Sequence, residues 1–81
     1  MPYIDLERRV EIDSGEPPET PGELNYLLTS LCLEYISTAP VLSYELLNEV
    51  VGVLESVKQE FYRRVVVPYE DNKILDNGDV Y

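Results

Sequence analysis

The stretch that decides the fold is LSYELLNEVVGVLESVKQEFYRRVVV, residues 42–67. Its apolar residues recur every three or four positions, which predicts one long amphipathic helix. Ser43 is a favourable N-cap, and Leu42 and Leu47 have the spacing of a hydrophobic staple around it. Pro68 follows and is expected to end or kink this helix, because proline lacks the N–H that an α-helix uses.

The apolar face of this helix is unusually wide. At about 100° per residue it spreads over roughly half of the helix circumference. One antiparallel partner helix needs a narrower stripe, so the remaining width is covered either by the N-terminal element or by a second subunit. Of these two we favour the second subunit, and the sequence therefore predicts a homo-oligomer. The face consists of Leu46, Leu47, Val50, Val51, Val53, Leu54, Val57, Phe61 and Val65.

Working towards the N-terminus, TPGELNYLLTSLCLEYISTAP (residues 20–40) predicts a second long helix. Thr20 is placed as its N-cap, Pro21 as its first residue and Glu23 as the partner in a capping box. The helix is expected to stop near Thr38. Tyr26 and Leu33 lie almost opposite its main apolar stripe and form a small patch suited to subunit contact.

The ends of the chain predict two shorter elements. IDLERRVEID, residues 4–13, fits either a short helix that Asp5 caps and Gly15 follows, or an extended stretch; we favour the helix. After Pro68 a new helical segment is expected, with Asn77-Gly78 as its C-cap. A hairpin at Asn77-Gly78 is disfavoured because only three residues follow the glycine.

These elements predict an all-α fold: a small helical bundle of two long antiparallel helices, a short N-terminal helix and a C-terminal helical segment after Pro68. We expect one domain, residues 1–81. It comprises an N-terminal element (1–13), an acidic proline-rich linker (14–20) and a helical body (21–81).

The composition argues against several functions. Sixteen acidic and six basic residues give a formal charge of −10, which argues against direct nucleic-acid binding, since that requires lysine and arginine. No apolar run is long enough to span a bilayer. The chain has no histidine and one cysteine, so we expect no catalytic site, no metal and no cofactor. MPYIDLERR resembles no signal peptide, and the lone cysteine fits a reducing compartment, so we expect a cytoplasmic protein.

The segment KQEFYRRVVVPY, residues 58–69, is net positive within this acidic chain. Arg63 falls on the polar face of the helix, whereas Arg64 falls at the edge of the apolar face and needs a partner. That partner is either water or a carboxylate, or else an anionic ligand. In the ligand interpretation, Arg63 and Arg64 hold phosphate while Tyr62 and Tyr69 offer rings for stacking. Asn25 and Tyr26 of the first long helix complete the set of predicted ligand-binding residues.

Three stretches resemble a family of small uncharacterised proteins encoded by phages and bacteria. They are GELNYLLTSL (22–31), LNEVVGVLESVKQEFYRRVVVPYEDNKILDNGDVY (47–81) and the opening MPYI. The resemblance implies a small helical protein in a bacterial cell and assigns no activity to it. In that setting we expect a non-enzymatic oligomer that binds an anionic nucleotide and thereby sequesters an immune signal. The alternatives are an acidic protein-binding inhibitor or DNA mimic, and a purely structural self-assembling protein.

Overall fold

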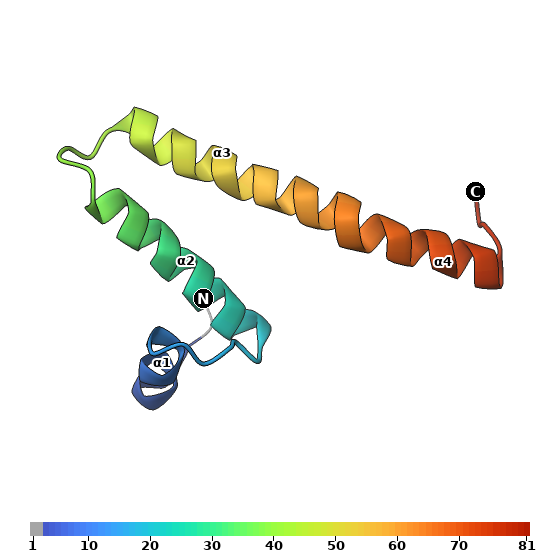
Figure 1. Ribbon diagram of the computed structural model, residues 1–81, viewed down its shortest axis with the longest axis horizontal. Coiled ribbons are helices and arrows are strands. Elements are labelled where there is room, and N and C mark those ends of the chain that lie inside the picture. The colour runs from blue at the N-terminus through green and yellow to red at the C-terminus, as the bar shows by residue number, and fades with distance from the viewer. Residues whose placement is uncertain (1–2) are drawn as a thin grey trace. The chain divides into compact units, whose positions relative to one another are not determined.

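The computed structural model describes residues 3–81, all of whose regular structure is helical (Figure 1). The first two residues of the predicted N-terminal element and of the motif MPYI lie outside the described residues. The chain divides into two compact units, residues 1–42 and 43–81. The all-α prediction is confirmed. The antiparallel packing of the two long helices stays a prediction, because each helix belongs to a different unit.

The first unit begins with helix α1, Leu6–Asp13, which confirms the helical interpretation of this segment. Asp5 precedes the helix, but its side chain accepts no capping hydrogen bond. The C-terminus is closed by a Schellman motif: the N–H of Gly15 donates to the carbonyl of Ile12 (3.0 Å) and that of Glu16 to the carbonyl of Glu11 (3.1 Å). Gly15 has φ +112°, a backbone conformation that residues with a Cβ rarely adopt.

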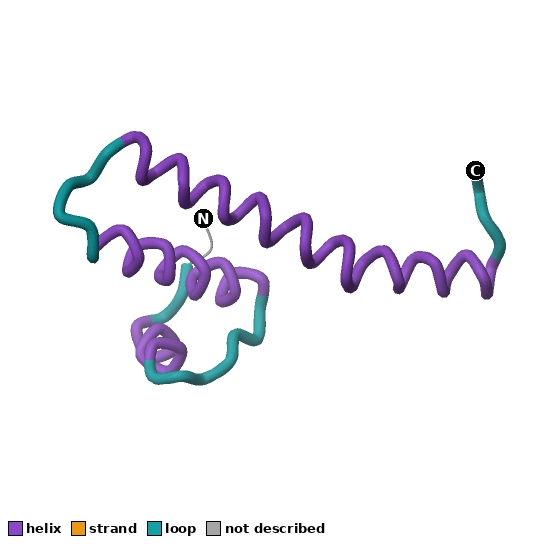
Figure 2. Tube along the Cα trace, turned by 45° about the horizontal axis from the view of Figure 1, so that its top comes forward, coloured by secondary structure: helices purple, strands orange, loops and turns teal. Residues whose placement is uncertain are grey.

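Helix α2, Pro21–Ser37, follows the loop 14–20 (Figure 2). Its N-terminus is capped as predicted, because the hydroxyl of Thr20 accepts the N–H of Glu23 at 3.1 Å. The Glu23 carboxylate in turn accepts the N–H of Glu19 at 2.9 Å, one residue before the N-cap and not at the N-cap itself. Helices α1 and α2 contact each other. Ile12 of α1, 2% exposed, is the one buried side chain among residues 3–81.

The second unit is a single helical rod from Tyr44 to Asn77. It consists of α3 (Tyr44–Phe61), a π-helical turn (Tyr62–Val66) and α4 (Val67–Asn77). Ser43 caps α3 as predicted, since its hydroxyl accepts the N–H of Leu46 at 3.1 Å. At about 1.5 Å per residue the rod is about 50 Å long.

Pro68 neither ends the rod nor breaks it. In a regular α-helix its ring would clash with the carbonyl of Arg64, four residues earlier, and would leave that carbonyl without a donor. The chain instead widens into the π-turn just before the proline, where the N–H of Val67 donates to the carbonyl of Tyr62, five residues back. A helical segment after the wide turn, and its closure at Gly78 (φ +85°), are confirmed.

Within residues 3–81, neither unit by itself contains the core of a helical bundle. No segment within residues 43–81 packs against the apolar face of α3. On this face Leu46 and Val50 are half-buried, and the other residues are between 39% (Leu47) and 66% (Val51) exposed. The rod therefore depends on a surface outside its own unit to bury this face.

Candidate functional site

Three of the predicted site residues, Tyr62, Arg63 and Arg64, lie together in the π-turn. Single π-turns within α-helices occur frequently at functional sites. The wide turn inserts an extra residue and so changes which side chains share a face of the rod. The helical wheel that placed Arg64 on the apolar face assumed a regular α-helix as far as Val65. That assumption fails from Tyr62 onwards, so the wheel does not give the face on which Arg64 lies.

One carboxylate, Glu60, serves both arginines of the π-turn. Arg63 donates from Nη2 to both oxygens of Glu60 at 2.9 Å, and Arg64 donates from Nε at 2.7 Å. These pairs hold the pKa of Glu60 below its ordinary value, with the Arg64 hydrogen bond contributing most. The Arg63 and Arg64 side chains are 68% and 73% exposed. The carboxylate partner of Arg64 therefore comes from its own helix, one turn before it.

The two tyrosines of the predicted site, Tyr62 and Tyr69, each make one weak contact. The hydroxyl of Tyr62 lies 3.4 Å from a carboxylate oxygen of Glu70. The ring of Tyr69 has the ammonium of Lys73 5.5 Å from its centre, within the range of a cation–π contact. Both tyrosines are more than half exposed. Their rings are accessible for stacking, and nothing in residues 43–81 holds the two rings against each other.

Asn25 and Tyr26 lie in the other unit, on α2. The hydroxyl of Tyr26 donates to both oxygens of Asp13 on α1, at 2.9 and 3.0 Å. This hydrogen bond raises the pKa of Tyr26, because the phenolate would lose it. The Oδ1 of Asn25 accepts the hydroxyl of Thr29 at 3.2 Å. The structure places these two residues together, beside α1.

An open cavity of about 320 Å³ lies beside this part of α2 and is also lined by Arg9 of α1 and by Tyr3 and Ile4, which precede α1. Its lining combines polar and apolar side chains with one arginine, Arg9. Sequence reasoning missed Arg9, although the doublet Arg8-Arg9 is as evident in the sequence as Arg63-Arg64. The lining residues are Tyr3, Ile4, Arg9, Gly22, Asn25, Tyr26, Thr29, Ser30 and Leu33.

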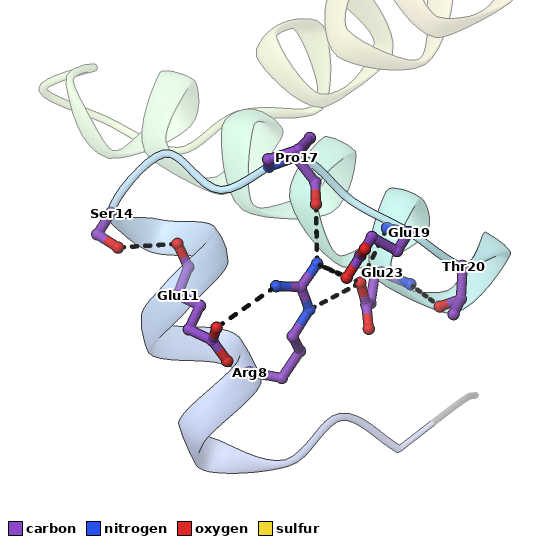
Figure 3. A network of polar contacts seen from close by, with 7 residues as sticks. All are labelled: Arg8, Glu11, Ser14, Pro17, Glu19, Thr20 and Glu23. Atoms are coloured by element: carbon purple, nitrogen blue, oxygen red, sulfur yellow. Dashed lines mark hydrogen bonds and ion pairs between the residues drawn. The ribbon is translucent and has the colours of Figure 1, made fainter.

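The neighbouring Arg8 has a structural role (Figure 3). Its Nε donates to Oε1 of Glu23 at 2.9 Å, and its Nη2 donates to the carbonyl of Pro17 at 2.8 Å. The carboxylates of Glu19 and Glu11 approach it at 3.1 and 3.8 Å. The guanidinium thus joins α1, the loop and the start of α2. The hydrogen bond between Arg8 and Glu23 raises the pKa of the arginine and lowers that of the glutamate.

Among residues 3–81, no three histidine, cysteine, aspartate or glutamate side chains gather in a way that could hold a metal ion. Within the same residues, no helix is both long enough and apolar enough to cross a bilayer.

Comparison with known proteins confirms one part of the resemblance, namely that the chain is similar to an uncharacterised family. No curated protein and no solved structure matches the chain. One family model matches residues 1–80, almost the whole chain. The association of such proteins with phages stays a prediction. The chain belongs to the family described as a domain of unknown function, DUF6899.

Proposed function

We propose that this protein is a non-enzymatic helical oligomer that binds a small anionic ligand of the nucleotide type at the π-turn. The observation that carries the proposal is the shared carboxylate: two exposed guanidinium groups have one acidic partner, Glu60. The three groups together retain one positive charge. Each guanidinium has five N–H donors, and most of those ten are not used by Glu60.

Phosphate suits this arrangement chemically. Its oxygens accept paired N–H donors from arginine in the same geometry as a carboxylate, so a phosphate can replace Glu60 on Arg64. Tyr62 and Tyr69 then offer exposed rings to a base. A two-fold axis through the oligomer would duplicate the arginine pair and favour a ligand with two phosphates. Sequestration of a nucleotide signal in an infected bacterial cell is the role that we assign to such binding.

Glu60 provides the sharpest test, because it competes with the ligand. We expect Glu60→Gln to strengthen nucleotide binding and Arg64→Ala to weaken it by roughly tenfold or more, the loss of one charge-assisted contact. Lys58→Ala is the matched control, since it removes an exposed cation of α3 that pairs with Glu55 and not with Glu60. Native mass spectrometry with a panel of linear and cyclic nucleotides gives the stoichiometry. Equal binding by wild type, Glu60→Gln and Arg64→Ala would refute the site.

Self-assembly without a ligand is the second candidate function, and the exposed apolar face of α3 favours it. This second function requires the same oligomer as the first proposal but no bound nucleotide. An oligomer that gains no mass from any nucleotide in the panel would favour this second function. The acidic-inhibitor alternative rests on the net charge of −10 alone and predicts a salt-sensitive complex with a basic protein.

A further inference from the structure

Arg9 differs from the other three arginines of the chain. Arg8 is held by Glu23, and both Arg63 and Arg64 are held by Glu60. Within residues 3–81, Arg9 makes no ion pair, and its Nε is buried without a hydrogen-bond partner. A buried donor without an acceptor is costly, and native structures rarely keep one without a reason. The Arg9 guanidinium therefore lacks a partner among residues 3–81, and an acceptor from outside the chain can bind its N–H groups other than the buried Nε–H.

The cavity beside Arg9 has room for such an acceptor. Its volume of about 320 Å³ is at the lower end of the range for small-molecule sites. Leu33 and Ile4 contribute apolar surface to the lining, as does the ring of Tyr26. The site can therefore take a molecule with an apolar body as well as a charged end.

Three residues of the lining, Arg9, Asn25 and Ser30, can donate hydrogen bonds to a ligand. Because Oδ1 of Asn25 already accepts the hydroxyl of Thr29, the amide NH2 of Asn25 is the part left to bind a ligand. Ser30 adds a hydroxyl to the same lining, and Arg9 adds its guanidinium. This donor set is complementary to an oxygen anion.

The neighbouring charge limits how negative that anion can be. The Asp13 carboxylate accepts the hydroxyl of Tyr26, a residue of the cavity lining, and repels added negative charge. One arginine opposed by one nearby carboxylate favours a single negative charge over two. We propose that this cavity binds a small monoanionic carboxylate with an apolar body, its oxygens on Arg9 and Asn25 and its body against Leu33 and Tyr26.

Benzoate is a suitable probe, and the measurement is a titration of the full-length protein followed by amide chemical shifts in NMR. We expect shifts concentrated at residues 4–9 and 22–33, with a dissociation constant in the millimolar range, as is usual for a ligand of about nine heavy atoms. Benzamide, which is neutral, should cause no saturable shift there. Phenyl phosphate, which carries nearly two charges, should bind more weakly than benzoate.

Two variants test the assignment. Arg9→Gln removes the charge, and Asn25→Asp places a repelling carboxylate on α2; each should weaken benzoate binding by roughly tenfold or more. Because Asn25 is exposed, Asn25→Asp should leave α2 folded, which circular dichroism checks. Lys58→Gln, on α3, is the control for a general loss of positive charge. Unchanged binding in both site variants, shifts confined to residues 60–70, or tighter binding of phenyl phosphate would each overturn the proposal.

Discussion

Replacing Ile12 by alanine should separate α1 from α2. Ile12 is 2% exposed and is the one buried side chain in residues 3–81, so no other fully buried contact compensates for its loss. Truncating a buried isoleucine to alanine costs about 2–5 kcal/mol. A unit of about 40 residues has a total stability of about 2–6 kcal/mol, at 0.05–0.15 kcal/mol per residue. The substitution therefore removes most of the stability of the first unit.

The assay is urea unfolding by circular dichroism, together with hydrogen exchange at the amides of Gly15 and Glu16, at one fixed protein concentration. Both amides are bonded within the Schellman motif and should lose protection when α1 is released. Val10→Ala is the matched control on the same helix: Val10 is 58% exposed, so its truncation should cost about 0.5 kcal/mol or less. If Val10→Ala destabilises the protein as much as Ile12→Ala, burial of Ile12 does not hold the unit together.

Three further predictions concern particular contacts. The Arg8 hydrogen bond, with a smaller contribution from the N–H of Glu19, lowers the pKa of Glu23, so the stabilisation is complete above the ordinary carboxyl pKa and is lost as the pH falls through the lowered value. An NMR titration of the Glu23 carboxyl should show the low midpoint, and Arg8→Gln should raise it towards the ordinary value. Ser43→Ala removes the cap of α3 and should cost about 1 kcal/mol, whereas Ser43→Gly should cost only a few tenths; thermal unfolding that ranks the two variants the other way contradicts the cap. Pro68→Ala restores a backbone donor and should convert the π-turn to regular α-helix. This change would turn α4 by about 100° relative to α3. Unchanged backbone chemical shifts at residues 62–66 would show that the proline does not cause the π-turn.

Four of the helix boundaries were predictable because their signals are local. Thr20 and Ser43 cap the first turns of α2 and α3, and Gly15 and Gly78 close α1 and α4 with positive φ. Each signal depends on residues within one turn of the boundary. For the same reason the ion pairs of Glu60 with the arginines one turn later could be read from the spacing.

What the sequence could not show depends on contacts between distant residues. Arg8 and Glu23 are fifteen positions apart, and no periodic pattern links them. The cavity beside Arg9 likewise exists only once α1 contacts α2. The π-turn is an intermediate case: Pro68 signals a disturbance four residues before it, but whether the helix ends, kinks or widens depends on which neighbouring carbonyls find donors.

We predict that a second copy of the chain covers the wide apolar face of α3. Sedimentation equilibrium of the 81-residue chain over a range of concentrations tests this prediction. We predict a mass of twice the 9.3 kDa chain or more at micromolar concentration, falling towards that of one chain in Leu54→Lys, which places a charge on the face. A single 9.3 kDa species at every concentration, unchanged by Leu54→Lys, would contradict the claim.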